Sequence, residues 1–208
     1  GATGFGYDIA RQFGLALVPQ RAGLVPLTFT DEMKQRCAVL SGLSVDALVS
    51  AGKTEFEEGM LFTHRGLSGP AILQASSYWG EGEALSINLL PELQLPVWLQ
   101  EQQRQRPKAH LSTVLKAVLP NRLVDALAGR WFDDQPLADL SADQRQQVSM
   151  RLGQWAFKPG GSEGYRTAEV TLGGISTDEF SSKTFEAKRY PGLYAIGEAL
   201  DVTGWLGG

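Results

Sequence analysis

The sequence has few of the residues that build covalent or metal-bound frameworks. Its 208 residues include one cysteine, Cys37, and two histidines, His64 and His110. A single thiol cannot form an internal disulfide, and these three residues are too few for the Cys/His cluster of a structural zinc site. A chain of this length buries about 70% of the surface that its unfolded form exposes, so its core needs neither device. We therefore expect no metal site, and we expect a reducing compartment.

Two further absences concern membranes and charge. No apolar run approaches the roughly 18 residues of a membrane span, and the first residues, GATGFGYDIARQ, lack the basic and apolar regions of a signal peptide. Lys and Arg number 19 against 23 Asp and Glu, which gives a net charge of −4. These features predict a soluble, cytoplasmic protein with no membrane partner, and we do not expect nucleic acid as a partner. No feature indicates an oligomeric state.

Glycine is almost absent from one block of the chain. Only two of the 24 glycines, Gly129 and Gly153, fall in residues 93–158, and glycine is costly inside helices. Ser141 and Gln144 have the spacing of a capping box at a helix start. The block is therefore predicted to form a helical bundle. Its clearest apolar face recurs at helical spacing, at Leu111, Val114, Leu115, Val118 and Leu119.

The flanking segments alternate apolar and polar residues, which is typical of strands. Leu85, Ile87 and Leu89 alternate with polar residues, and a similar pattern runs over residues 167–172. An antiparallel sheet or barrel over residues 24–92, completed by the strand near 167–172, is the simplest assembly. The other predicted strands are Leu24 to Phe29, Ala38 to Leu40, Val45 to Val49, Lys53 to Glu57 and Met60 to Thr63.

The two chain ends do not have the pattern of domain ends. The chain opens on a glycine-rich loop, residues 1–6, which leads into a predicted helix from about Tyr7 to Phe13. Such a loop normally follows a strand. The last residues, Gly207 and Gly208, come directly after Trp205 and Leu206. We therefore expect this chain to be part of a longer protein.

Small residues gather after predicted strands near the end of the chain. The apolar run Leu193 to Ile196 fits a buried parallel strand, and it ends in Gly197 and Glu198. Backbone N–H groups reach phosphates and flat ligands where no Cβ intervenes, so these positions are candidate ligand contacts. Ordinary turns are the alternative for each of them. The other members of the group are Gly173 and Gly174 after Leu172, and Gly204, Gly207 and Gly208 after Asp201.

Longer motifs carry a resemblance to a known family. The order T-G-F-G, T-L-G-G-I, P-G-L-Y-A-I-G-E and D-V-T-G-W-L-G-G resembles the later motifs of flavoproteins with two dinucleotide-binding domains. More narrowly, the chain is similar to a bacterial family of FAD-dependent oxidoreductases of the aminoacetone-oxidase-like type. The internal motifs that carry this similarity lie at residues 21–27, 61–74 and 164–175.

The resemblance implies an α+β fold in three parts. Residues 1–20 and 173–208 would be remnants of an α/β, Rossmann-like FAD-binding domain. Residues 21–92 and 159–172 would form the antiparallel β-barrel of an inserted domain, and residues 93–158 its helical subdomain. No G-x-G-x-x-G follows a strand here, so the nucleotide-binding half of the family is missing from this chain. We expect the activity to belong to the longer protein and this portion alone to be inactive.

The resemblance also implies a cofactor and its contacts. FAD would be the cofactor of the longer protein, NAD(P)H its electron donor, and a small molecule its substrate, held between the FAD domain and the insert. Thr3, Gly4 and Gly6 would lie at the active face of the flavin. The remaining expected FAD contacts are Thr171, Gly173, Gly174, Gly197, Glu198, Asp201, Gly204, Gly207 and Gly208.

Two residues are catalytic candidates, and one alternative function stays open. Histidine is the side chain suited to proton transfer near neutral pH and arginine can clamp a carboxylate, so His64 and Arg65 are candidates for proton delivery and substrate polarisation. The alternative for His64 is a structural cap of the turn before Gly66. The alternative function is a protein- or RNA-interaction module without redox catalysis. It is supported by residues 93–158, where nine Lys and Arg against six Asp and Glu give +3.

Overall fold

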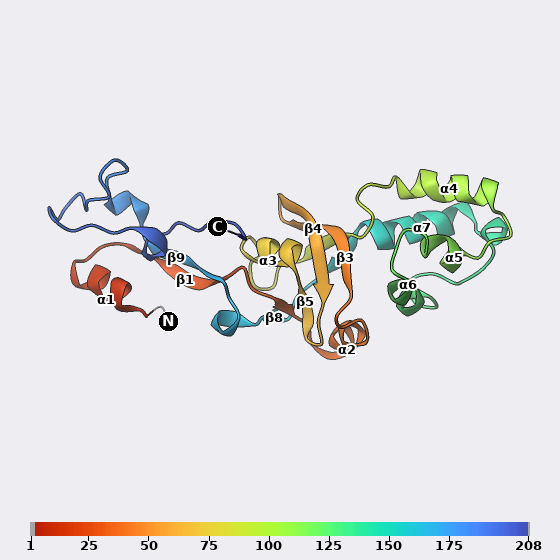
Figure 1. The fold of residues 1–208 in the computed structure, drawn as a ribbon, viewed down its shortest axis with the longest axis horizontal. Coiled ribbons are helices and arrows are strands. Elements are labelled where there is room, and N and C mark those ends of the chain that lie inside the picture. Colours follow the sequence, from red (N-terminus) through yellow and green to blue (C-terminus); the bar gives the residue numbers. More distant parts are fainter. Residues whose placement is uncertain (1–2, 208) are drawn as a thin grey trace. The chain divides into compact units, whose positions relative to one another are not determined.

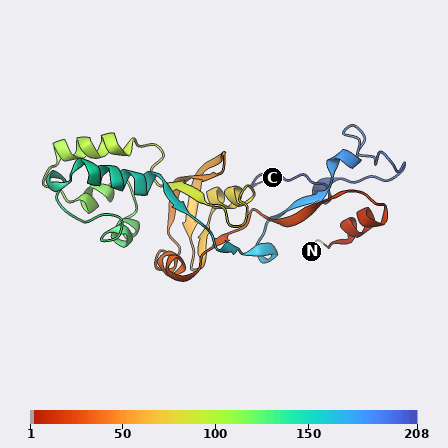
Figure 2. The same cartoon turned by 180° about the vertical axis from the view of Figure 1, so that it is seen from behind.

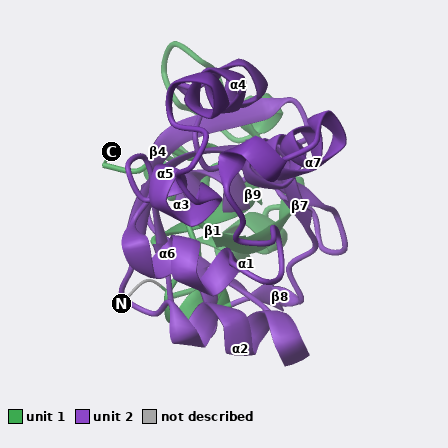
Figure 3. Ribbon diagram, turned by 90° about the vertical axis from the view of Figure 1, so that its right-hand side faces the viewer, with its two compact units in different colours: residues 1–25, 163–208 green, residues 26–162 purple. Residues whose placement is uncertain are grey.

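The structure is a computed structural model that describes residues 3–207 (Figure 1). It divides into two compact units (Figure 3). Unit 1 consists of the chain up to Val25 together with the chain from Glu163 onward, and unit 2 is Pro26–Ser162. Unit 2 is therefore inserted into unit 1. The architecture is α+β with antiparallel sheets, as predicted. Among residues 3–207, every helix is too short or too polar to cross a membrane.

Unit 2 is built on one antiparallel sheet of seven strands. The strand order is β7-β6-β3-β4-β5-β2-β8. β3 and β4 are antiparallel, and their pairing runs from Ser44 opposite Leu61 to Ala51 opposite Thr54. The two strands expected at 53–57 and 60–63 therefore form one continuous strand. The strands are β2 (Leu27–Thr28), β3 (Ser44–Ala51), β4 (Thr54–Phe62), β5 (Gly66–Ser68), β6 (Leu85–Asn88), β7 (Trp155–Phe157) and β8 (Gly161–Ser162).

The sheet rolls into a partly open barrel. Its two edge strands, β7 and β8, are separated in the chain by residues 158–160 alone, and so short a segment spans at most about 14 Å. The two edges of the sheet must therefore lie close together. Phe29, which directly follows β2, packs edge-on against Phe157 of the edge strand β7, with ring centroids 5.1 Å apart.

One predicted strand of unit 2 is wrong. Residues 38–40 lie at the end of helix α2 (Asp31–Val39). Three consecutive apolar residues have no periodicity of their own, so they fit a helix end as well as a strand. The helix is supported by the ion pair of Glu32 with Arg36, four residues apart, at 2.6 Å, and by burial of Cys37.

The helical block forms as predicted and shares its core with the barrel. Ser141 Oγ accepts the Gln144 N–H at 3.1 Å, and the Gln144 side chain accepts the Ser141 N–H at 2.9 Å, which confirms the capping box. The predicted apolar face buries Leu111, Val114 and Leu115 completely. Figures 1 and 2 show the helices gathered at one end of unit 2. They are α4 (Leu95–Gln105), α5 (Leu111–Leu115), α6 (Asn121–Leu127) and α7 (Ala142–Gly153), while α3 (Pro70–Ser76) lies against the sheet.

Unit 1 is a small assembly around a two-stranded sheet. β1 (Leu17–Gly23) pairs antiparallel with β9 (Val170–Ile175), and α1 (Phe5–Gln12) packs beside them. The strand expected near 167–172 therefore exists as β9, but it pairs with β1 and not with the seven-stranded sheet. Few large side chains are buried in this unit. Its buried cluster consists of Ala10, Leu15, Ile175, Phe180, Ala187 and Leu200.

A polar network joins the two chain segments of unit 1. Glu179 accepts the Ala16 N–H at 3.0 Å, and its carboxylate pairs with Arg189 at 3.1 Å. The Arg189 guanidinium also donates to the Gly14 carbonyl at 2.7 Å. The hydrogen bond from Ala16, followed by the Arg189 interaction, lowers the pKa of Glu179 below its ordinary value of 4.5.

The close approach of β5 to β2 generates a stability prediction. A Cβ at Gly66 would lie 2.2 Å from the Leu27 carbonyl oxygen, whereas a Cβ at Gly59 would meet nothing nearer than 3.8 Å. Gly66→Ala should therefore lower the free energy of unfolding by about 1–3 kcal/mol or more. The matched control, Gly59→Ala, should stay within about 1 kcal/mol of the wild type. Urea unfolding measures both, and equal effects of the two substitutions would contradict this account of the sheet.

The Glu179 network generates a pH prediction. Because its folded pKa is lowered, Glu179 stabilises unit 1 above the ordinary pKa of 4.5, and this stabilisation is lost as the pH falls through the folded pKa. Glu179→Gln should therefore lower the midpoint of thermal unfolding at about pH 7 and have a smaller effect at about pH 3. Asp178→Asn, at the exposed neighbouring carboxylate, is the control. A Glu179→Gln deficit that is the same at both pH values would overturn the assignment.

Candidate functional site

Unit 1 brings several predicted cofactor residues together. Ile175, at the end of β9, forms a parallel bridge with Leu200, and its carbonyl accepts the Asp201 N–H at 2.8 Å. The Thr203 hydroxyl donates to the Thr171 carbonyl at 3.5 Å. The two glycine-containing segments 171–175 and 197–203 therefore lie side by side, with the short helix η4 (Gly197–Ala199) at the start of the second.

Two of the predicted glycines are explained by packing of the chain itself. Gly173 has φ +80°, and a Cβ there would lie 2.2 Å from the Pro19 carbonyl oxygen. A Cβ at Gly174 would lie 2.8 Å from the carbonyl oxygens of Ala199 and Leu200. Backbone therefore occupies the space that a side chain would need at these two positions. Both glycines are required for the close approach of β9 to its neighbours.

The other predicted glycines face open space. A Cβ would meet nothing within 4 Å at Gly4, Gly197, Gly204 or Gly207. Gly197 and Gly207 also have left-handed backbone, with φ of +69° and +92°. Open space beside exposed backbone N–H groups is what a bound phosphate or flat ring requires. These four positions are accordingly available to a ligand.

Three further predicted positions complete this description. At Gly6, an added Cβ would be in ordinary contact with the Ala199 Cβ at 3.8 Å. Thr3 is exposed, and Gly208 lies outside the described residues.

Two exposed apolar side chains lie next to the open glycines along the chain. Ile196 is 73% exposed and Trp205 is 63% exposed, on either side of Gly197 and Gly204 in the chain. The prediction of a buried strand at 193–196 is therefore wrong. A buried parallel strand needs neighbours on both sides, and among the described residues Tyr194 bridges to Glu186 alone.

The two predicted carboxylates beside the open glycines are accessible. Glu198 and Asp201 are exposed, and the Tyr7 hydroxyl of α1 donates to the Glu198 backbone carbonyl at 3.5 Å. Because these contacts use backbone groups, both carboxylates can accept hydrogen bonds from ligand hydroxyls.

The catalytic candidates lie in unit 2, at the turn between β4 and β5. The Thr63 hydroxyl accepts the N–H groups of Arg65 and Gly66 at 3.3 and 3.0 Å. Thr63 therefore caps this turn. This is the structural role that was the alternative to catalysis for His64. His64 is exposed at the tip, and the Arg65 carbonyl accepts the Phe29 N–H at 2.9 Å. The turn presents the imidazole to solvent from a backbone that is held on both sides.

The single thiol and the metal-binding residue types of the described part of the chain form no further site. Burial raises the pKa of the Cys37 thiol to about 12, so this thiol stays protonated at neutral pH and is a poor nucleophile. Among residues 3–207, no group of three or more His, Cys, Asp or Glu side chains lies close enough to hold a metal ion.

Comparison with known proteins identifies relatives along the whole chain. The chain is 51% identical over 211 residues to the Ribosomal RNA dihydrouridine synthase of Escherichia coli (strain K12) and 45% identical over 215 residues to the Haemophilus influenzae protein of the same name. It is 29% identical over 224 residues to the 3-dehydro-bile acid delta(4,6)-reductase of Clostridium scindens. All of this chain is covered, but only 52%, 52% and 54% of these relatives. The chain therefore spans about half the length of the curated relatives it matches.

These relatives correct two expectations. Two of them are named for ribosomal RNA, so the expectation that nucleic acid is not a partner is wrong. Net charge misled here, because it averages over segments of opposite charge: residues 93–158 carry +3, whereas the rest of the chain carries −7. The narrower aminoacetone-oxidase-like assignment is not supported, since the similar enzymes are named as a synthase and a reductase.

The family match covers residues 21–170, which include the barrel and the helices α2 to α7. Its description as an HI0933-like protein barrel and H2TH domain agrees with the rolled sheet and the helical block. The chain belongs to the HI0933-like family.

Proposed function

We propose that the longer protein containing this chain is a flavin-dependent reductase that converts uridine in ribosomal RNA to dihydrouridine. The observation that carries the proposal is the 51% identity to a Ribosomal RNA dihydrouridine synthase along the entire chain. The substrate is then a nucleotide within RNA, in place of the free small molecule expected from the sequence.

The names of the relatives describe related chemistry. Dihydrouridine is uridine whose C5–C6 double bond, conjugated to the C4 carbonyl, has been reduced. A 3-dehydro compound with delta(4,6) unsaturation likewise has double bonds conjugated to a ketone. Each reduction adds one hydride and one proton across a conjugated double bond. One hydride-transferring cofactor combined with different substrate pockets is consistent with the names of the synthase and the reductase.

The residues of unit 1 fit one side of an FAD site. Gly197, Gly204 and Gly207 leave open space beside backbone, and Trp205 offers an exposed apolar surface near them in the chain. Glu198 is placed to accept hydrogen bonds from ribityl or ribose hydroxyls. Thr3, Gly4, Gly6, Thr171, Gly173, Gly174 and Asp201 remain proposed contacts, and Gly173 and Gly174 also allow β9 to approach its neighbours closely. FAD supplies the hydride when bound, and NAD(P)H is the proposed electron donor.

His64 and Arg65 are the proposed contribution of unit 2 to the reaction. After hydride addition at C6 of uracil, a proton must be delivered to C5. An exposed imidazole can donate it near neutral pH, and a guanidinium beside it can hold a phosphate of the RNA. His64 would therefore act as proton donor and Arg65 as a substrate-binding residue.

The proposal predicts a specific cofactor and product. The full-length protein, purified with FAD, should have a flavin absorbance spectrum that NAD(P)H bleaches without oxygen. Ribosomal RNA from cells that lack the enzyme should then yield a uridine nucleoside with two additional hydrogens by mass spectrometry. A protein that binds RNA but takes up no FAD and leaves uridine unchanged would favour the interaction module instead.

The role of His64 generates a separate prediction. His64→Gln should slow dihydrouridine formation by about 10²- to 10⁴-fold, because general acid catalysis typically contributes that much. Bleaching of the flavin by NAD(P)H should be unaffected in the same variant. Gln20→Ala, at a partly buried glutamine outside the proposed machinery, is the control. Wild-type product formation by His64→Gln would remove His64 from the mechanism.

A further inference from the structure

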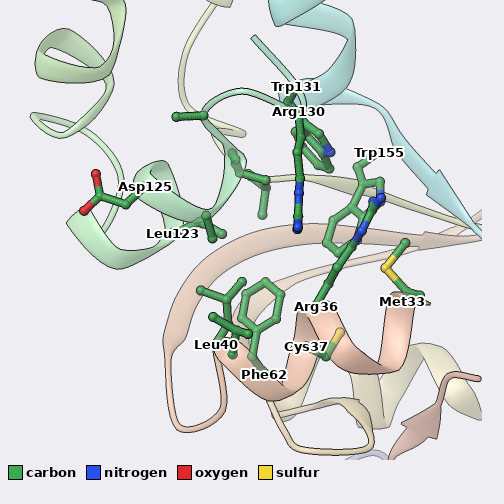
Figure 4. A pocket seen from close by; sticks show the side chains of 15 residues that line it. Met33, Arg36, Cys37, Leu40, Phe62, Leu123, Asp125, Arg130, Trp131 and Trp155 are labelled. Atoms are coloured by element: carbon green, nitrogen blue, oxygen red, sulfur yellow. The ribbon is translucent and has the colours of Figure 1, made fainter. Parts of the chain in front are cut away.

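A cavity lies entirely within unit 2. It has a volume of about 320 Å³, which is at the lower end of the range for small-ligand sites. Its walls come from α2, the end of β4, α6, the loop after α6 and the start of β7 (Figure 4). Most of the lining is apolar, through residues such as Leu40, Phe62 and Leu123.

Two guanidinium groups enter this cavity from different elements. Arg36 extends from α2 and Arg130 from the loop after α6, and both side chains point into the space beside Trp155 (Figure 4). The Glu32 carboxylate pairs with Arg36 and also interacts with Arg130, so one negative charge offsets one of the two guanidinium charges and the cavity keeps a net positive charge. The arrangement therefore favours a negatively charged ligand.

The carboxylates near the cavity already have partners. Glu32 pairs with Arg36 at 2.6 Å, and Asp125 pairs with Lys116 at 2.5 Å. Arg36 is nevertheless incompletely satisfied, because its Nε atom is buried and has no hydrogen-bond partner among the described residues. An anion in the cavity could accept a hydrogen bond from this group, which a buried polar atom requires.

Indole rings form the other part of the cavity. Trp131 and Trp155 are half-buried, and they contact each other edge-to-face with centroids 5.4 Å apart. The Trp155 ring also contacts the Phe157 ring, and their centroids are 5.3 Å apart. Partly exposed indoles beside guanidinium groups are the combination that holds unstacked nucleic-acid bases and their phosphates.

The walls of the cavity are fixed before any ligand binds. The Arg122 guanidinium of α6 donates to the carbonyls of Val39 and Ser41, which ties α6 to the end of α2. The Arg151 guanidinium of α7 donates to the Arg130 and Trp131 carbonyls. The Arg151 hydrogen bonds hold the backbone of Arg130 and Trp131, whose side chains line the cavity. A ligand would therefore meet a preorganised site.

We propose that this cavity binds an unpaired nucleotide of RNA, with its phosphate between Arg36 and Arg130 and its base against Trp131 and Trp155. The choice of RNA rests on the proposed function, whereas the anionic and aromatic character of the ligand rests on the cavity itself. A base within a duplex is stacked and cannot reach an indole ring. The cavity therefore selects single-stranded or looped RNA.

The test measures RNA binding by the full-length protein with flavin bound. The probe is fluorescein-labelled decauridylate, and its fluorescence anisotropy is measured between about 50 and 200 mM salt. Arg36→Gln/Arg130→Gln should weaken binding at least tenfold and reduce the salt dependence, by about 0.7 in log–log slope for each phosphate that the variant no longer neutralises. The matched control is Arg104→Gln/Arg106→Gln, which removes two exposed charges of the same helical block outside the cavity. It should change affinity less than threefold.

A charge-preserving variant tests the aromatic part. Trp131→Leu should weaken binding about tenfold with an unchanged salt slope, because stacking involves no phosphate. Trp131→Phe, which keeps an aromatic ring, should restore most of the affinity and shows that the fold tolerates replacement.

Several outcomes overturn the inference. Equal losses from the two arginine pairs would indicate bulk attraction and no nucleotide site, and wild-type affinity in the cavity variants would exclude the site directly. If those variants bind normally while the protein still forms dihydrouridine, the inference fails and the proposed function stands. If decauridylate binding depends on the cavity but the wild-type protein forms no dihydrouridine, the proposed function fails and the RNA site stands.

Discussion

The pairing of β1 with β9 is the constraint on which unit 1 depends. These two strands carry the chain into and out of unit 2, and Gly23 at the end of β1 is the register partner of Val170 at the start of β9. The two strands approach closely, because an added Cβ at Gly173 of β9 would lie 2.2 Å from the Pro19 carbonyl oxygen of β1. With such a small buried cluster beside it, unit 1 relies on backbone contact where larger units rely on apolar burial.

Sequence patterns predicted the elements whose signals are local. The capping box at Ser141 and the apolar face from Leu111 lie within single helices, so spacing alone is sufficient to predict them. The predictions at 38–40 and 193–196 failed because three or four apolar residues fit several structures. Which one forms depends on distant partners, such as the barrel core that buries Cys37.

The same distinction applies to the candidate sites. Gly173 and Gly197 look alike in the sequence, and only the neighbouring backbone distinguishes a packing glycine from one that faces open space. The cavity with Arg36, Arg130 and Trp155 had no signal in the sequence, since its members come from three separate elements. Its tryptophans resemble ordinary core residues, and its arginines resemble ordinary surface charges. Net charge is similarly uninformative, because recognition depends on where the charges lie.

The insertion of unit 2 also bears on how the two units could be recombined. The chain leaves unit 1 after Val25 and returns at Glu163, close to the register partners Gly23 and Val170, and paired strands of this kind place their Cα atoms about 5 Å apart. An insert whose ends lie so close together can be exchanged without separating the strands that carry it. Chimaeras joined at these two points, between this chain and the bile-acid reductase that it resembles, would show whether unit 2 can be exchanged as a whole.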